Sequence, residues 1–155
     1  MSDYQAIVEL LYRYAELVDR GDYEGIARMF EHGAITAAGS DHADRGHDAV
    51  LARYVDWTRR HDDGTPRTKH VTSNPIVEIS ADGEQATVRS YFTVLQQTAK
   101  VPLQPIIAGR YEDRMERVDG TWRFAHRHMI PELFGDLSDH LHQPIDRTQH
   151  TGGST

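Results

Sequence analysis

Apolar residues recur at helical spacing in the N-terminal part of the chain. The first such stretch begins after Ser2, which forms a capping-box pattern with Gln5, and it ends near Gly21, a natural C-terminal stop. Its apolar positions are Tyr4, Ile7, Val8, Leu11, Ala15 and Val18. Because they are three or four residues apart, they predict an amphipathic helix with one face on a core.

Two shorter helices and a short strand are expected next. Asp22 is a suitable N-cap for the second helix, and the third helix begins near Gly46. The third helix closes in the polar stretch RRHDDGTPR, residues 59–67. Between the two helices, AITAA at residues 34–38 is typical of a short strand.

From Thr68 onward the apolar pattern changes to a period of two, which is typical of β-strands. The strand candidates are HVTSNPIVEIS, EQATVRSYFTVLQQ, PIIAGRYEDRMERV and TWRFAHRHMI. Asp82-Gly83 and Asp119-Gly120 lie where tight hairpins would join these strands in pairs. Helices followed by an antiparallel meander indicate the α+β class, with the helices covering one face of a curved sheet.

Length, net charge and composition exclude several classes of protein. The chain has 155 residues, which fits a single domain, and the final QHTGGST is expected to be disordered. A net charge of −7 argues against a nucleic-acid partner. No apolar run is long enough to cross a bilayer and MSDYQA is unlike a signal peptide, so we expect a cytoplasmic protein with no membrane partner. Without cysteine, any chemistry is left to His, Asp, Glu, Tyr and Arg.

Tyr14 and Asp19 are notable positions on the first helix. At about 100° per residue, Tyr14 lies within the apolar stripe and Asp19 lies at its boundary. Tyr14 is therefore either a packed core aromatic or a residue that faces a cavity. Asp19 is either a solvated residue or a carboxylate held by another group, because the dipole disfavours an acid at this end of a helix.

The order of elements and three segments of the sequence point to a family. RYAELVDRGD, RTKHVTSNPIVEI and GRYEDRMERVDGTWRFAHR make the chain resemble, over about residues 3–130, the SnoaL-like branch of the nuclear transport factor 2-like superfamily. The resemblance implies a conical α+β barrel, with three helices packed on a strongly curved, mostly antiparallel sheet around a deep pocket. It places this cone domain at residues 1–135 and a tail at residues 136–155, expected to cover the pocket mouth or to exchange onto a partner.

The resemblance also implies a set of catalytic residues. Tyr14 matches a helix-one tyrosine that relatives such as ketosteroid isomerase and the dehydratases place in the pocket. Asp19 matches the carboxylate that orients a strand histidine in the bile-acid dehydratase type, and His70 resembles that histidine. Ketosteroid isomerase has its carboxylate base on the first short strand, where this chain has only ITAAGS, so proton transfer is left to His70.

These three residue types suit acid–base chemistry without a metal or a cofactor. Histidine changes charge near neutral pH, so His70 can take a proton and return it. Asp19 would fix its tautomer, and Tyr14 would hydrogen-bond an oxygen as it becomes negative. The alternative for His70 is a strand-edge residue that bonds a neighbouring carbonyl. Histidine pairs such as His126 and His128 are a weak metal signal, because no carboxylates cluster near them in the sequence.

Further polar residues are candidates for substrate contacts. Asn74 can bond a substrate oxygen, although its place before Pro75 also favours a β-bulge. Strand alternation places Tyr111 on one face together with Asp113, for which an ion pair with Arg127 across the last hairpin is expected. The same alternation places Trp122, Phe124, His126 and His128 on one face, so His126 is a second pocket histidine candidate or a structural residue.

Large apolar residues lie on the elements expected around the cone. They are Phe30, Trp57, Phe92, Ile107, Met115 and Phe124, of which Trp57, Phe92, Ile107 and Phe124 join Asn74, Tyr111 and His126 as substrate-binding candidates. Each of these residues is also compatible with simple core packing. A pocket lined in this way suits a flat or polycyclic molecule with one or two oxygens.

The sequence therefore favours a cofactor-independent lyase or isomerase of the dehydratase type. Its substrate would be a hydrophobic, carbonyl-containing small molecule such as a polyketide, a steroid or an aromatic compound. The alternatives are a non-catalytic small-molecule binding protein of the same fold, or a structural subunit like the small subunit of ring-hydroxylating dioxygenases. The resemblance also implies a homo-oligomer, a dimer or higher, formed through the open sheet face that carries Thr87, Arg89, Tyr91 and Thr93.

Overall fold

Three helices precede the long strands in the computed structural model, which describes residues 1–145. The helices are α1 (Asp3–Arg20), α2 (Tyr23–Met29) and α3 (Gly46–Trp57). The strands are β1 (Ala34–Ala37), β2 (Ala43–Arg45), β3 (Thr68–Ile79), β4 (Gln85–Gln96), β5 (Gln104–Val118) and β6 (Thr121–Phe134). The expected disorder of the final residues lies outside the described part.

The ends of α1 are fixed by the residues that predicted them. The Ser2 hydroxyl accepts a hydrogen bond from the Gln5 backbone N–H at 3.2 Å, and the Gln5 side chain accepts one from the Ser2 N–H at 2.9 Å. Gly21 takes the left-handed conformation with φ 71°, which ends the helix and which glycine adopts without a steric penalty. The capping box and the C-terminal glycine are thus confirmed.

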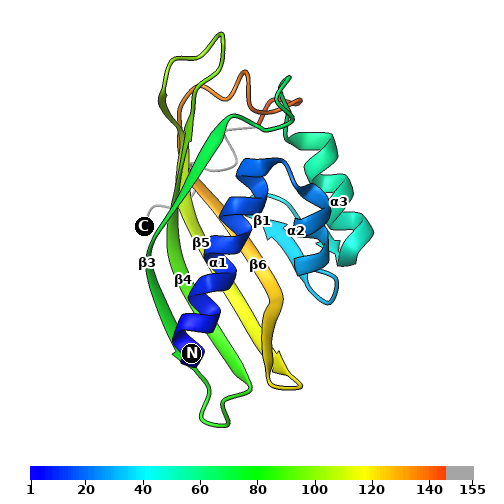
Figure 1. Cartoon of the computed structure of the whole chain (residues 1–155), viewed down its shortest axis with the longest axis vertical. Helices are drawn as coiled ribbons and strands as arrows, with labels where there is room; N and C mark the ends of the chain where they lie inside the picture. Colours follow the sequence, from blue (N-terminus) through cyan, green and yellow to red (C-terminus); the bar gives the residue numbers. More distant parts are fainter. Residues whose placement is uncertain (146–155) are drawn as a thin grey trace.

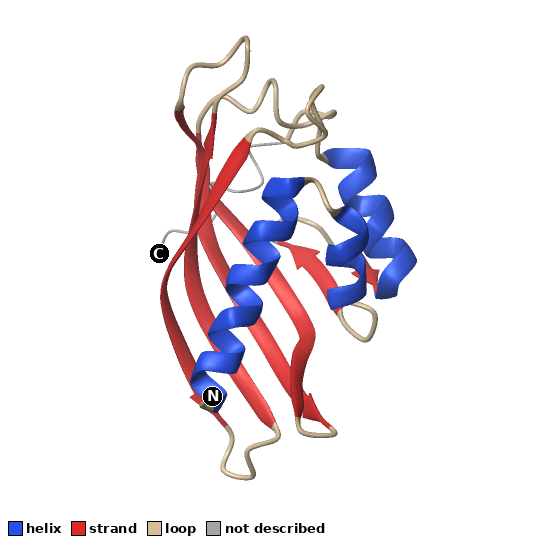
Figure 2. Cartoon of the chain, viewed as in Figure 1, coloured by secondary structure: helices blue, strands red, loops and turns tan. Residues whose placement is uncertain are grey.

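The six strands form one curved, open sheet in the order β2-β1-β6-β5-β4-β3. The four long strands are the predicted antiparallel meander, and the two Asp-Gly hairpins lie together at the lower end of the molecule (Figure 1). β1 extends the sheet by pairing with β6 in parallel, and β2, which the sequence analysis did not predict, pairs antiparallel with β1. All three helices lie on the same side of this sheet (Figure 2).

The core lies between α1 and the inner face of the sheet. Its fully buried apolar side chains include Ile7, Leu11, Ile26, Phe30, Ile35, Ile106 and Phe124. Phe30, which directly follows α2, stacks on Phe124 of β6 with ring centroids 4.7 Å apart. The expectation that Phe30, Met115 and Phe124 line the pocket is therefore wrong, because these side chains fill the closely packed part of the core.

A β-bulge reverses the expected facing of the second half of β6. Met115 pairs with Phe124 and Arg114 with His126, so Ala125 is an extra residue in β6. Beyond this bulge Arg127, rather than His126, faces inward with Phe124, and Arg127 is fully buried. Simple alternation from Trp122 therefore gave the wrong face for His126 and His128.

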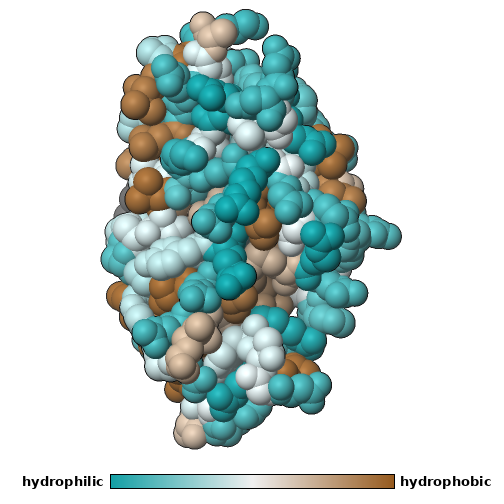
Figure 3. All heavy atoms as spheres, viewed as in Figure 1, coloured by the Kyte–Doolittle hydropathy of each residue, from teal (hydrophilic) through white to brown (hydrophobic). Residues whose placement is uncertain are grey.

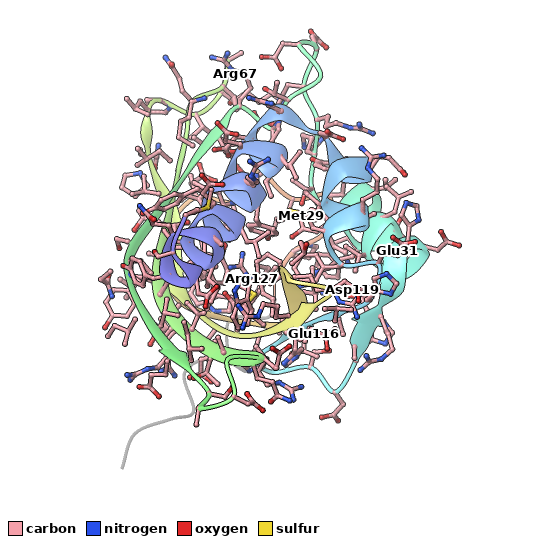
Figure 4. All side chains as sticks on the ribbon, turned by 60° about the horizontal axis from the view of Figure 1, so that its bottom comes forward. Met29, Glu31, Arg67, Glu116, Asp119 and Arg127 are labelled. Atoms are coloured by element: carbon pink, nitrogen blue, oxygen red, sulfur yellow. The ribbon has the colours of Figure 1, made fainter. Side chains whose placement is uncertain are left out.

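Asp113 and Arg127 pair across the β5–β6 hairpin, as predicted. Asp113 accepts two hydrogen bonds from Arg127, at 2.9 Å from Nε and 2.8 Å from Nη2. The guanidinium carbon lies 4.3 Å from the ring centroid of Tyr14 and 3.8 Å from that of Tyr111. Figure 4 shows Arg127 in the interior, whereas Arg67 and Glu31 lie at the periphery.

The outer face of the sheet carries side chains of mixed character. Thr87, Arg89 and Tyr91 are exposed on β4 as expected, and Thr93 is half-buried. On the neighbouring β3, Val71 and Ile76 are 47 % and 49 % exposed. Hydrophilic residues cover most of the surface in Figure 3, with brown apolar patches along the edge where β3 lies. None of the helices within residues 1–145 is long and apolar enough to cross a bilayer.

Candidate active site

A cavity of about 760 Å³ lies between the helices and the sheet. Val94 and Ile107 line it from the ends of β4 and β5 that are opposite the two hairpins. Apolar side chains from α1, α3, β4, β5 and the C-terminal segment form most of its wall. They include Val18, Trp57, Phe92, Val94, Ile107, Leu137, Leu141 and Ile145. A cavity of this size and character suits an organic molecule of two or three rings.

His70 and Asp19 form a buried pair at the cavity wall. His70 Nδ1 lies 2.7 Å from Asp19 Oδ1, and the exposed fractions of the two side chains are 9 % and 11 %. Two further groups hold the carboxylate: the His70 backbone N–H donates to Oδ2 at 2.8 Å, and the Thr68 hydroxyl donates to Oδ1 at 2.8 Å. Asp19 at the end of α1 is thus held by the start of β3, and it is not a solvated residue.

This arrangement selects one tautomer of His70. An ionised carboxylate only accepts hydrogen bonds, so Nδ1 of His70 carries the proton and donates it to Asp19. Nε2 then has the lone pair that can accept a proton, and His70 lines the cavity. Burial raises the pKa of Asp19, but the hydrogen bonds and charge of His70 outweigh burial and hold that pKa below its ordinary value of 3.8. Asp19 is therefore ionised at neutral pH.

Three tyrosines form a second polar feature of the cavity. The hydroxyl of Tyr14 on α1 is hydrogen-bonded to that of Tyr54 on α3, and the ring of Tyr14 meets that of Tyr111 edge to face at 6.0 Å. All three residues line the cavity. Burial, with a smaller contribution from Tyr14, raises the pKa of Tyr54 and of Tyr111 well above 10, so both hydroxyls keep their protons. Protonated phenols of this kind can donate to an oxygen that becomes negative.

The structure brings together most of the predicted site. Tyr14 and His70 line the cavity, Asp19 holds His70 from behind, and four substrate-binding candidates also line it. These four are Trp57, Phe92, Ile107 and Tyr111.

Three predicted substrate-binding residues lie elsewhere. Asn74 is exposed with φ 43°, in the bulge between Ser73 and Ile76, which is the alternative that the sequence left open. Phe124 is packed in the core, as described above. His126 is turned away by the bulge at Ala125, and its Nε2 bonds the Thr36 hydroxyl at 2.8 Å.

Several residues of the cavity were missed by the sequence analysis. His140, from the segment after β6, lies in the wall near His70. On another part of the wall Asp44 accepts one hydrogen bond from Arg53 at 2.8 Å, and its other carboxylate oxygen lies 2.9 Å from His42 Nε2. These residues are polar and belong to no periodic apolar pattern in the sequence. Their place in the cavity wall is therefore visible only in the folded structure. Within residues 1–145, no three His, Asp or Glu side chains gather so as to hold a metal ion.

Comparison with known proteins agrees with this geometry. The family model described as the SnoaL-like domain matches residues 1–128. A search of the curated proteins gives no significant match. Among solved structures, a protein of unknown function from Mycobacterium tuberculosis is 29 % identical, with a TM-score of 0.68 over 84 % of this chain and 73 % of that chain.

Two further structures are similar. One, provisionally titled a scytalone dehydratase, from Novosphingobium aromaticivorans, is 25 % identical with a TM-score of 0.68 over 94 % of each chain. The other is the β subunit of an aromatic-ring-hydroxylating dioxygenase, also provisionally assigned, from the same organism. It is 16 % identical with a TM-score of 0.65 over 84 % of this chain and 89 % of that chain, so it supports the fold alone. Because its family model covers residues 1–128, this chain belongs to the SnoaL-like family.

Proposed function

We propose that this protein is a cofactor-independent lyase or isomerase of the dehydratase type, acting on a hydrophobic, carbonyl-containing small molecule. The observation that carries the proposal is the buried Asp19–His70 pair on the wall of an apolar cavity. A carboxylate that fixes the tautomer of an imidazole makes that imidazole a better general base. The similarity to a structure titled as a scytalone dehydratase supports the same class of reaction.

The reaction begins at the carbon next to the carbonyl of the substrate. His70 Nε2 takes a proton from this carbon, and the electrons of the broken C–H bond form the enolate. Tyr14, bonded to Tyr54, donates a hydrogen bond to the enolate oxygen. Asp19 stabilises the imidazolium that His70 becomes.

The second step depends on the substrate. If a hydroxyl is attached at the β-carbon, the carbonyl re-forms, the C–O bond breaks and the proton on His70 joins the departing oxygen as water. The products are an unsaturated ketone and water, and His70 is again neutral. Without such a hydroxyl, return of the proton to another carbon isomerises the substrate. Both outcomes use the same base and need no metal or cofactor.

A bicyclic β-hydroxy ketone is a suitable test substrate. Dehydration of a β-hydroxy tetralone gives an unsaturated ketone, which tautomerises to a naphthol by moving a ring proton to the oxygen. The naphthol is followed by ultraviolet absorbance. We expect wild type to catalyse this reaction, His70→Gln to abolish it, and Asp19→Asn to lower kcat by about 10²–10⁴-fold. His126→Gln, which changes a histidine outside the cavity, is the matched control and should retain full activity. Turnover by His70→Gln would refute the proposed mechanism, and tight stoichiometric binding without turnover would indicate a carrier.

We also propose that the protein is a homo-oligomer, a dimer or higher, that uses the outer face of the sheet. Tyr91 is 57 % exposed there, beside Val71 and Ile76 of β3. Mixed aromatic and aliphatic side chains of this kind are common in interface centres. Light scattering should give an oligomer for wild type and a monomer for Tyr91→Glu, with Tyr12→Glu on the outer side of α1 as the control. A monomeric wild type at high concentration would exclude this assembly.

A further inference from the structure

The mechanism above leaves one buried imidazole of the cavity without a role. His140 is 7 % exposed and lines the cavity together with His70, and its buried Nδ1 has no hydrogen-bond partner among residues 1–145. A buried polar atom without a partner is unfavourable, so its presence calls for an explanation such as a catalytic role or a bound molecule. His140 thus lies in the cavity wall beside the base, with a ring that makes no hydrogen bond to the described residues.

The backbone holds His140 in a fixed place. The carbonyl of His140 accepts a hydrogen bond from the Arg59 N–H at 2.8 Å, and the His142 N–H donates to the Trp57 carbonyl at 3.0 Å. The preceding carbonyl, of Asp139, is bonded by the His61 ring at 3.0 Å. These contacts attach the C-terminal segment to the loop after α3, so the ring of His140 enters the cavity from a supported backbone.

The surroundings of His140 keep it uncharged. Burial, with smaller contributions from the neighbouring His70 and His61 and a small opposite effect of Asp19, lowers its pKa to about 3. His140 therefore stays neutral when His70 gains a proton, because two adjacent buried cations repel each other. A neutral imidazole can donate a hydrogen bond from one nitrogen and accept one at the other.

We propose that His140 binds the β-hydroxyl of the substrate and holds it next to His70. The inference rests on the proposed function and specifies its substrate class: a β-hydroxy ketone, with the carbonyl oxygen at Tyr14 and the hydroxyl oxygen at His140. In this arrangement His140 orients the leaving oxygen, and His70 delivers the proton that it took from carbon. His140 is not the acid, since it carries no proton to release as an imidazolium.

Paired probes separate this role from that of the base. Tetralone has the carbonyl alone, and its α-proton exchange in heavy water reports on His70. The β-hydroxy tetralone adds the hydroxyl, and its dehydration reports on both histidines. For His140→Phe we expect dehydration to fall at least about tenfold, which is the loss of one hydrogen bond, while α-proton exchange of tetralone is unchanged. His140→Gln, which keeps a donor and an acceptor, should restore part of the dehydration rate.

His142→Gln is the matched control, because His142 is exposed and does not line the cavity. Equal losses in both reactions for His140→Phe would show that His140 acts on His70 and would overturn the proposal, as would no loss in either. His70→Gln should abolish both reactions.

A binding measurement keeps the proposal testable if wild type turns over neither probe, in which case the proposed function fails. Calorimetry should then show that wild type binds the β-hydroxy tetralone about tenfold more tightly than tetralone, and that His140→Phe removes this preference. A His140→Phe protein that retains the preference would overturn the role of His140. A near-ultraviolet circular dichroism spectrum identical to that of wild type establishes that each variant is folded.

Discussion

Asp113 and Arg127 lie edge to edge inside the protein, and neither side chain has any exposed surface. Burial lowers the pKa of Arg127, but the charge and hydrogen bonds of Asp113 outweigh burial and hold that pKa above its ordinary value. Arg127 therefore stays charged, between the rings of Tyr14 and Tyr111. Because Tyr14 and Tyr111 also line the cavity, the buried ion pair is in contact with the polar part of the cavity wall.

Removal of one partner leaves a buried charge uncompensated. We expect Asp113→Asn to lower the free energy of unfolding by about 3–5 kcal/mol, measured by urea denaturation. Glu116→Gln breaks the ion pair with Arg123 on the same two strands, where both side chains are about one third exposed, and should cost at most about 1 kcal/mol. If both variants lost a similar free energy of unfolding, burial would not be the reason for the large effect expected at Asp113.

Thr68 supports the carboxylate of the Asp19–His70 pair. Thr68→Val removes one hydrogen bond to Asp19, so the lowered pKa of Asp19 should rise toward 3.8, followed by carboxyl-carbon NMR. Because the pKa of Asp19 is lower in the folded protein than in the unfolded chain, ionised Asp19 stabilises the folded protein at neutral pH. This stabilisation is lost as the pH falls through the pKa that Asp19 has in the folded protein. The variant should therefore be less stable than wild type by about 1 kcal/mol at pH 7, with a smaller difference at low pH.

Thr68→Ser is the control for this change, since it retains the hydroxyl and should behave like wild type. An unchanged titration of Asp19 in Thr68→Val would mean that the two groups are not coupled.

His140 should make stability depend on pH. Its pKa is about 3 in the folded protein and near 6.5 when unfolded. Between these values only the unfolded chain binds the proton, so the free energy of unfolding falls by up to about 1.4 kcal/mol for each unit that the pH is lowered. Denaturation measured at several pH values should show that the free energy of unfolding of His140→Gln lacks this dependence on pH, whereas that of His142→Gln retains it. Parallel slopes for wild type and His140→Gln would show that His140 titrates normally.

Tyr54 should influence catalysis through Tyr14. Tyr54→Phe removes the hydroxyl that is bonded to Tyr14, which leaves the Tyr14 hydroxyl less well oriented toward the enolate oxygen. We expect kcat for dehydration to fall about tenfold, with little change in KM. Tyr12→Phe alters an exposed tyrosine of the same protein and should have no effect. A rise in KM alone would indicate that Tyr54 only contributes to substrate binding.

Local signals were sufficient for most of the fold. Ser2, Gly21 and Asp22 set the helix boundaries through hydrogen bonds to nearby residues, which a sequence pattern can show. The pairing of Asp113 with Arg127 followed from the hairpin turn, because the turn fixes the register of both strands. For the Asp19–His70 pair, helix geometry placed Asp19 at the boundary of the apolar stripe, and the family resemblance supplied His70 as its partner.

Other features depend on contacts that no local pattern encodes. The single extra residue Ala125 reverses the facing of His126 and Arg127, and the burial of the Asp113–Arg127 pair accompanies that reversal. The strand β2 has only three residues and forms because β1 offers a free edge. His140 reaches the cavity through hydrogen bonds between a segment without periodicity and the loop after α3.

The cavity occupies one end of the molecule, and fully buried side chains that do not line it fill the other. Near the hairpins Ile7, Leu11 and Phe124 fill the space between α1 and the sheet, whereas Val18 at the far end of α1 faces the cavity. A side chain such as Val94 or Ile107 can thus change without opening a hole among the residues near the hairpins. During evolution, such a division lets the ligand preference diverge at one end while selection for folding acts on the other.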